Sequence, residues 1–181
     1  KNILVIGFGR IGSNFVKRAL AFDMNVYVYD PYVEKEKVKI SGAIPVDNIS
    51  ENLPKMDAVT LHCPKNDETT DLFTKQEFDL MKKSSFIINC ARGGILNEED
   101  LYEALTRKKI AGAGLDVFDV EPTPSSNSLF KLNNVILSPH IAGVTVESTV
   151  RMATETVQNV LDVLDDKINQ SVVVNNKEIG M

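Results

Sequence analysis

Short apolar runs alternate with longer amphipathic segments along most of this chain. The first two runs are Ile3–Ile6 and Val26–Tyr29, and a helical repeat over Ile11–Leu20 lies between them. Buried strands of a parallel sheet read as short apolar runs, and crossover helices between them repeat about every 3.6 residues. The alternation therefore predicts an α/β fold: a doubly wound parallel sheet of about seven strands with helices on both faces.

The same pattern continues towards the end of the chain. It predicts further strands at residues 43–46, 57–63, 85–90, 110–117 and 135–138, and a short one at 172–174. Helices are predicted at about 33–41, after Thr74, after Asn97, and over about 145–167. Thr74 and Glu77 have the spacing of a capping box, and Asn97 is a favourable N-cap residue before three acids. The apolar face of the last helix predicts packing on the chain's own sheet, on a further domain or on a second subunit.

A glycine motif, Gly7-x-Gly9-x-x-Gly12, joins the first strand to the first helix. Gly7 permits a sharp turn, Gly9 lets a pyrophosphate approach the backbone, and Gly12 lets the helix pack close to the sheet. The helix N-terminus offers unpaired N–H groups and a positive dipole end to phosphates. The motif predicts a Rossmann-type dinucleotide site.

Asp30 ends the second strand, 18 residues after Gly12 (30 − 12). A carboxylate at this position accepts hydrogen bonds from the adenosine ribose and repels a 2′-phosphate. Pro31 and Tyr32 follow it, so neither of the next two residues is a lysine or arginine that would attract that phosphate. We therefore expect NAD as the cofactor rather than NADP.

Charge and composition exclude several other partners. The net charge is −5 without a long run of Lys and Arg, which argues against nucleic acid as a partner. No apolar stretch approaches the roughly 20 residues of a membrane span. No cluster of His, Cys and acids has the spacing of a metal site, so we expect no metal. Two free cysteines, Cys63 and Cys90, are typical of a reducing compartment, and we expect a cytoplasmic protein with buried thiols.

Further polar residues follow the predicted strands at the edge where ligands of such sheets bind. Arg92 follows the fifth strand, Glu121 comes shortly after the sixth, and His140 follows the seventh. Arginine holds carboxylates by two hydrogen bonds, and histidine exchanges protons near neutral pH. A carboxylate beside a histidine orients the ring and favours its charged form. His62 ends the fourth strand without an evident catalytic partner, so we expect it to be a packed histidine.

The segments around these residues resemble the D-isomer-specific 2-hydroxyacid dehydrogenase family, most closely its phosphoglycerate dehydrogenase branch. They are residues 90–94 (Cys-Ala-Arg-Gly-Gly), 114–118 (Gly-Leu-Asp-Val-Phe), 121–122 (Glu-Pro) and 139–143 (Pro-His-Ile-Ala-Gly). The resemblance implies an NAD-dependent oxidoreductase that interconverts a D-2-hydroxy acid and its 2-oxo acid. Arg92 would bind the substrate, His140 would be the acid and base, and Glu121 would pair with His140.

The same resemblance implies contacts to the cofactor at matching positions. Besides the three glycines, these positions are Arg10, Ile11, Asp30, Cys63, Pro64, Cys90, Ala91, Arg92, Asp116, His140, Ala142 and Gly143. In this family the cofactor domain is inserted into a substrate domain that mostly precedes the glycine motif. Residues 1–181 are therefore expected to be the NAD-binding domain with its long helix and tail. Most of the substrate domain is expected to lie outside them, so the fragment by itself should be weakly active or inactive.

The resemblance also implies a homodimer formed through cofactor domains, with a small 2-hydroxy or 2-oxo acid as the other partner. Two alternatives stay open from the sequence. Transcriptional corepressors of the C-terminal-binding-protein type resemble the family, keep the same three residues and respond to NAD(H). The second alternative is a relative of formate dehydrogenase. That subgroup has a Gln-acid arrangement before its histidine, whereas this chain has Glu121.

Overall fold

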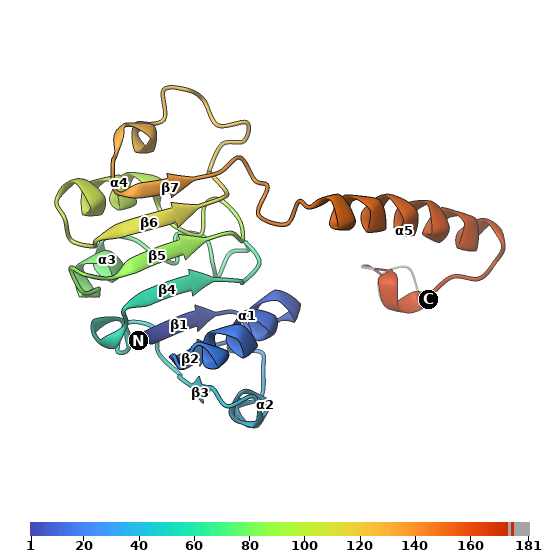
Figure 1. Ribbon diagram of the computed structural model, residues 1–181, viewed down its shortest axis with the longest axis horizontal. Coiled ribbons are helices and arrows are strands. Elements are labelled where there is room, and N and C mark those ends of the chain that lie inside the picture. The colour runs from blue at the N-terminus through green and yellow to red at the C-terminus, as the bar shows by residue number, and fades with distance from the viewer. Residues whose placement is uncertain (174, 176–181) are drawn as a thin grey trace. The chain divides into compact units, whose positions relative to one another are not determined.

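The computed structural model describes residues 1–173 and residue 175 (Figure 1). By its internal contacts the chain divides into two compact units, Lys1–Ala142 and a second one that starts at Gly143. The first unit is a layered α/β domain, and the second contains one long helix.

The first unit contains one seven-stranded sheet in the order β3-β2-β1-β4-β5-β6-β7. Every neighbouring pair is parallel, so the carboxyl ends of the strands share one edge (Figure 1). The strands are β1 Asn2–Ile6, β2 Asn25–Tyr29, β3 Ile44–Pro45, β4 Ala58–Leu61, β5 Phe86–Asn89, β6 Gly112–Leu115 and β7 Val135–Leu137. The chain builds outward from β1 in both directions, which confirms the predicted doubly wound sheet.

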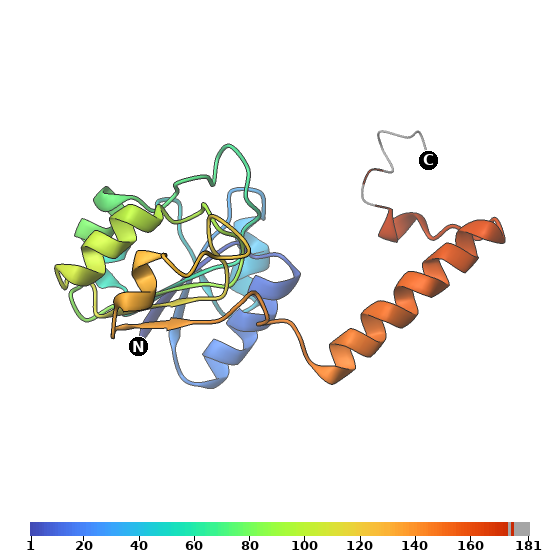
Figure 2. The same ribbon diagram turned by 90° about the horizontal axis from the view of Figure 1, so that it is seen from above.

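Helices cover both faces of this sheet because alternate strand residues point to opposite sides. Ile3 and Val5 of β1 join one apolar cluster with α1 (Arg10–Ala21) and α2 (Lys35–Ile40). Leu4 and Ile6 join the other cluster, which includes buried residues of α3 (Lys75–Leu80) and α4 (Glu98–Thr106). Figures 1 and 2 place α1 on the opposite face from α3 and α4.

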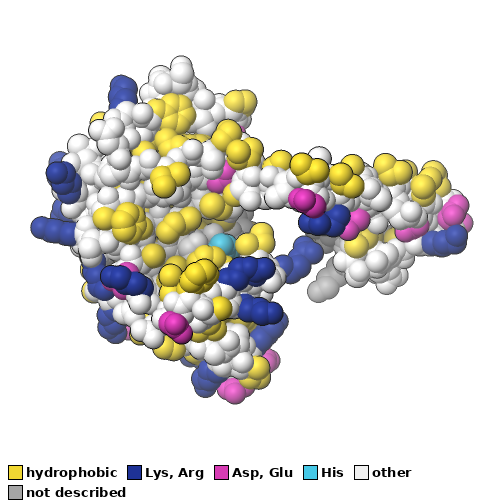
Figure 3. All heavy atoms as spheres, viewed as in Figure 1, with side chains coloured by type: hydrophobic (Ala, Val, Ile, Leu, Met, Phe, Trp, Pro, Cys, Tyr) yellow, Lys and Arg dark blue, Asp and Glu magenta, His cyan; other side chains and the backbone are white. Residues whose placement is uncertain are grey.

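On the face of the sheet that packs against α1, helices do not cover every strand. Ile88 of β5, Gly114 of β6 and Ile136 of β7 are in register on this face, and Phe86 lies on the same side of β5. The side chain of Ile136 is 80% exposed and that of Phe86 is 50% exposed. Apolar side chains gather over β5–β7 in Figure 3, so this part of the sheet presents an apolar surface.

The predicted elements of unit 1 are all present, but several are shorter than expected. The third strand has only Ile44–Pro45, and the sixth runs over Gly112–Leu115 rather than residues 110–117. Both predicted N-caps are confirmed: Thr74 and Glu77 form the capping box, and the Asn97 side chain accepts the Asp100 N–H. Short 3-10 turns at Leu53–Lys55 and Ser128–Lys131 were not predicted, because three or four residues are too short for a periodic pattern.

The second unit is dominated by α5, Val146–Leu164. Thr145 and Ser148 cap its N-terminus reciprocally. No residue of α5 is buried. The predicted strand at 172–174 is wrong for Val172, which ends a 3-10 turn, Gln170–Val172; Val174 lies outside the described residues. Within the described part of the chain, no helix is long and apolar enough to cross a membrane.

Candidate active site

The glycine turn between β1 and α1 has the geometry of a phosphate cradle. Gly7 has a φ of +95°, and a Cβ there would lie 2.7 Å from the backbone of His62. A Cβ on Gly12 would lie 2.0 Å from the Gly7 carbonyl oxygen, whereas one on Gly9 would meet nothing within 4 Å. Gly7 and Gly12 are therefore required by packing, and Gly9 leaves the backbone open to a ligand.

The N-terminus of α1 leaves its first N–H groups available. Its N-cap residue is Gly9, and no side chain caps the helix or places an acid in the first turn. Arg10 and Ile11 are exposed at this end. Unpaired N–H donors, the positive dipole end and an arginine together suit a pyrophosphate.

A pocket of about 200 Å³ continues from this turn along the ends of β1, β2 and β4. The predicted cofactor residues that line it are Gly7, Gly9, Asp30, Cys63 and Pro64. Burial raises the pKa of the Cys63 thiol, which suits a neutral wall residue better than a nucleophile. The pocket and the glycine turn fit the adenosine and pyrophosphate halves of a dinucleotide.

His62 also lines this pocket and is half-buried. Its Nε2 lies 3.1 Å from the Thr60 hydroxyl, and its ring centroid is 5.3 Å from that of Phe15. Burial lowers the pKa of His62, which favours the neutral ring. These contacts agree with the expected packed histidine.

The turn after β5 is fixed by a buried asparagine. The Asn89 side-chain oxygen accepts the Ala91 N–H at 3.0 Å, and its amide donates to the Arg92 carbonyl at 2.8 Å. Arg92 itself is exposed, and its guanidinium donates to the Ala91 carbonyl at 2.6 Å. Cys90 is also exposed, so the expectation of two buried thiols is wrong: Cys90 follows β5 on the open edge of the sheet.

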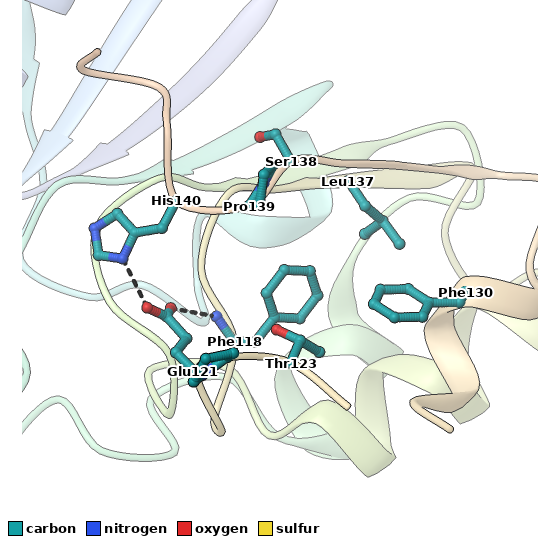
Figure 4. A pocket seen from close by; sticks show the side chains of 9 residues that line it. Phe118, Glu121, Thr123, Phe130, Leu137, Ser138, Pro139 and His140 are labelled. Carbon is teal, nitrogen blue, oxygen red and sulfur yellow. Dashed lines mark hydrogen bonds and ion pairs between the residues drawn. The ribbon is translucent and has the colours of Figure 1, made fainter. Parts of the chain in front are cut away.

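The predicted histidine–carboxylate pair is present after β6 and β7. His140 Nδ1 lies 2.7 Å from Glu121 Oε2, and Glu121 Oε1 accepts the Phe118 N–H at 3.0 Å (Figure 4). Hydrogen bonding to His140, and then to Phe118, holds the pKa of Glu121 below its ordinary value. The carboxylate is therefore ionised and oriented beside the imidazole.

Asp116 fixes the backbone around His140. It is 2% exposed, and its carboxylate accepts Ser138 Oγ at 2.6 Å and the Ile141 and Ala142 N–H groups at 2.8 Å. Burial alone would raise the pKa of Asp116, but these three hydrogen bonds outweigh burial and leave the pKa lowered. The Asp116 carbonyl also accepts the His140 N–H at 2.7 Å.

Next to the pair lies a larger pocket of about 630 Å³. Phe118, Phe130, Leu137 and Pro139 form its apolar wall, and Figure 4 shows the His140–Glu121 pair on one side of it. The His140–Glu121 pair thus lies beside an apolar wall, where the imidazole can exchange a proton with a bound molecule.

The predicted residues thus form three groups. The first comprises the glycine turn, the start of α1 with Arg10 and Ile11, and the lining of the 200 Å³ pocket, called the adenosine pocket below. The second is the turn of Cys90, Ala91 and Arg92, and the third is Asp116 with Glu121, His140 and Ala142. Among described contacts, Arg92 makes no hydrogen bond to Glu121 or His140. Gly143 belongs to the second unit, and a Cβ there would meet nothing within 4 Å. Within the described ranges, no group of three or more His, Cys, Asp or Glu residues could hold a metal ion.

Asn89, Ser138, Tyr32 and Glu68 also contribute to the site, although no role was predicted for them. The first two hold the Arg92 and His140 turns, and the last two line the adenosine pocket. Asn89 and Ser138 stand beside predicted residues in the sequence, which is a usable signal. Nothing in the sequence places Glu68 beside Tyr32.

The chain is similar to one known family over most of its length. The model of the NAD-binding domain of D-isomer specific 2-hydroxyacid dehydrogenases matches residues 1–142. D-3-phosphoglycerate dehydrogenase of Methanocaldococcus jannaschii is 43% identical, over 96% of this chain and 33% of that protein. Glyoxylate reductase of Thermofilum pendens is 37% identical, over 99% of this chain and 52% of that protein. The chain thus spans between a third and about half of these relatives.

Solved structures with the same fold contain two different cofactors. The D-lactate dehydrogenase of Aquifex aeolicus, complexed with NAD and lactic acid, has a TM-score of 0.83 and 35% identity, over 92% of this chain and 54% of that one. An acyclic imino acid reductase in complex with NADPH and D-Arg has a TM-score of 0.81 and 33% identity, over 93% of this chain and 52% of that one.

Proposed function

The chain belongs to the D-isomer-specific 2-hydroxyacid dehydrogenase family, and we propose that its protein is an NAD-dependent oxidoreductase that interconverts a D-2-hydroxy acid and its 2-oxo acid. The 2-oxo acid that corresponds to D-3-phosphoglycerate is the first substrate to test, because several similar relatives are named D-3-phosphoglycerate dehydrogenase. The observation that carries the proposal is the hydrogen bond of 2.7 Å between His140 and Glu121 at the carboxyl edge of the sheet.

The residues that would hold NAD are the glycine turn, the start of α1 and the wall formed by Asp30, Cys63 and Pro64. When bound, the nicotinamide supplies or accepts the hydride. The chain's own contribution is placement, through the α1 N-terminus at the pyrophosphate and Asp30 at the ribose.

His140 would hold the proton that the reaction moves. Its Nδ1 faces Glu121, which leaves Nε2 as the ring nitrogen directed to substrate. In reduction, Nε2–H donates its proton to the carbonyl oxygen, and in oxidation the neutral ring takes the proton of the alcohol. The ionised Glu121 stabilises the charged ring and fixes its orientation.

Arg92 would bind the substrate carboxylate. Its guanidinium is exposed on the edge that also carries His140, and its turn is fixed by the Asn89 side chain. A planar guanidinium binds a carboxylate by two parallel hydrogen bonds and stays charged at all working pH values. This binding would place the neighbouring carbonyl carbon for reaction.

We further propose that residues outside these 181 form most of the substrate domain, and that residues 1–181 form the cofactor domain. The apolar surface of Phe86, Ile88 and Ile136 supports a homodimer formed through cofactor domains, since such surfaces mark interfaces. A cytoplasmic location fits two free cysteines.

The test uses the protein with both domains. NADH oxidation is followed against a panel of 2-oxo acids, and NADH binding is measured in the same samples. We expect His140→Gln to lower turnover by about 100-fold or more, because a general acid is lost. Its NADH dissociation constant should change little, since His140 does not line the adenosine pocket.

Glu99→Gln is the control, because Glu99 is an exposed acid of α4 outside both pockets. It should behave like the wild-type protein. Unchanged turnover in His140→Gln would reject the proton-transfer role. Tight NADH binding without turnover of any 2-oxo acid would reject the dehydrogenase assignment.

A further inference from the structure

The adenosine pocket is lined by two charged side chains among the described residues, and both are acidic. They are Asp30, which was expected, and Glu68, which was not. No lysine or arginine belongs to that described lining. Since solved relatives of similar identity contain NAD or NADPH, the fold alone does not select the cofactor, and these side chains become the relevant variable.

Asp30 is held in place by backbone donors on two sides. Its Oδ2 accepts the Phe8 N–H from the glycine turn at 2.7 Å, and its Oδ1 accepts the Tyr32 N–H at 2.9 Å. The carboxylate is therefore fixed at the junction of the pyrophosphate and adenosine sites. Tyr32 belongs to the same loop and also lines the pocket.

Tyr32 connects this loop to the loop that follows β4. Its phenol donates a hydrogen bond to the Glu68 carboxylate. The hydrogen bond to Glu68 is the largest cause that raises the pKa of Tyr32, and the charges of both Glu68 and Asp30 add to it. Asp30 accepts the backbone N–H of Tyr32 and Glu68 accepts its phenol, so both carboxylates contact one residue and line one pocket.

The loop around Glu68 is itself well ordered by hydrogen bonds. Asn66 Oδ1 accepts the Glu68 N–H at 3.1 Å, and Thr69 Oγ1 donates to the Pro64 carbonyl at 2.6 Å. The nearest lysine in the sequence, Lys65, is directed elsewhere: a Cβ on Gly94 would lie 2.3 Å from its Nζ. Lys65 therefore does not neutralise Glu68.

We propose that Glu68, oriented by Tyr32, is a second carboxylate that selects against a 2′-phosphate on the adenosine ribose. The inference rests on the proposed NAD site and extends it. A 2′-phosphate adds negative charge, which a second carboxylate disfavours by Coulomb repulsion, whereas an uncharged 2′-hydroxyl is not repelled. Asp30 would bind the hydroxyls, and Glu68 would contribute charge without replacing that contact.

The test measures dissociation constants of NADH and NADPH by fluorescence titration of the whole protein. Glu68→Gln keeps an oxygen that can accept the Tyr32 hydrogen bond but removes the charge. We expect NADPH to bind about threefold to tenfold more tightly, while NADH stays within about twofold. The gain should shrink between about 0.05 M and about 0.5 M salt, because salt screens exposed charges.

Asp67→Asn is the matched control, because it removes the same charge from the neighbouring, exposed residue that does not line the pocket. It should leave the NADH to NADPH ratio unchanged. Tyr32→Phe removes only the hydroxyl that orients Glu68, and we expect a smaller gain for NADPH than with Glu68→Gln.

The outcomes separate this inference from the proposed function. Suppose that Glu68→Gln binds NADH normally and that its ratio of NADH to NADPH dissociation constants equals that of the wild type or of Asp67→Asn. That result would overturn the role of Glu68 and leave the proposed function standing. A wild-type protein that binds neither dinucleotide would overturn the proposed function and this inference with it.

Discussion

His140 has a φ of 54°, in the left-handed region that residues with a side chain seldom adopt. Such a conformation persists only where neighbouring groups fix it. Here Asp116 supplies that constraint twice, through its carbonyl to His140 and through its carboxylate to the next two N–H groups. The orientation of the imidazole therefore depends on a buried carboxylate that it does not touch directly.

Ser138→Ala tests this dependence. It removes one donor to Asp116, which is buried, and we expect a loss of about 1–3 kcal/mol in the free energy of unfolding, as for hydrogen bonds to charged groups. Turnover should fall with little change in NADH affinity, because the His140 turn loosens. Ser138→Thr retains a hydroxyl and should restore most of both losses.

The pH dependence of this stability difference has a definite sign. The pKa of Asp116 in the folded chain is lowered from its ordinary value of 3.8. The hydrogen bonds to its carboxylate therefore stabilise the fold fully above about pH 3.8, and this contribution is lost as the pH falls through the lowered pKa. Denaturation at several pH values should show the gap between wild type and Ser138→Ala narrowing in acid. Equal stability of the Ala and Thr variants would contradict a role for the hydroxyl.

For single residues, the sequence predicts a role where that role depends on a local motif. Gly7, Gly12 and Asp30 belong to one strand-turn-helix-strand unit, and their geometry is as expected. Tyr32 and Glu68 are 36 positions apart, and only the packing of two loops brings them together. Periodicity and spacing carry no signal for such a contact.

Among the secondary-structure elements, the amino-terminal ends of β1, β4 and β5 are joined by one carboxylate. Asp57 precedes β4, accepts the Asn2 N–H at 2.8 Å at the start of β1, and pairs with Lys82 at 3.0 Å before β5. The Asn2 and Lys82 hydrogen bonds lower the pKa of Asp57 from 3.8 to about 2. Parallel strands lack hairpin turns, so contacts of this kind align their starts.

Asp57→Asn should therefore destabilise the fold in a pH-dependent way. Because the pKa of Asp57 is lower in the folded chain, its contribution is complete above pH 3.8 and is lost as pH falls towards about 2. Thermal unfolding should show a lower Tm for the variant near neutral pH and a shrinking difference in acid. Asp47→Asn is the control for loss of a surface carboxylate, because it breaks only an exposed pair with Lys35. A difference in Tm between Asp57→Asn and wild type that stays constant with pH would contradict the assignment.

The elements themselves differ in how well the sequence predicts them. Thr74 and Asn97 cap their helices through side chains within three residues, which is a local signal. The third strand is short because it pairs with only two residues of β2, Tyr27 and Val28. The sequence of a strand does not show how many residues of its neighbour pair with it, so this length could not be predicted. Val172 has β-branched neighbours but lies in a 3-10 turn, where local context overrides propensity.

For the whole molecule, the alternation of apolar runs with amphipathic segments predicts the sheet and the helices on both of its faces. It does not predict which part of a face the helices leave exposed. Ile136 and Phe86 look like core residues in the sequence and are exposed on the α1 face of β5–β7. The apolar positions of α5, Val150 and Val157 among them, are also exposed. The hydrophobic pattern of a sequence shows which side chains are apolar. It does not show whether the surface that they pack against belongs to the same chain.

The division into units gives the last prediction. All buried apolar residues of the described chain lie in unit 1, as do Asp30, Asp116 and the glycine turn. A chain of residues 1–144 should therefore fold cooperatively without the rest of residues 1–181, because both core clusters consist of residues of unit 1. NADH at about 100 times its dissociation constant should stabilise both chains by about 2.7 kcal/mol, measured by denaturation with and without NADH. If the shorter chain unfolds or loses this stabilisation, unit 1 needs residues beyond 144 to fold or to bind NADH.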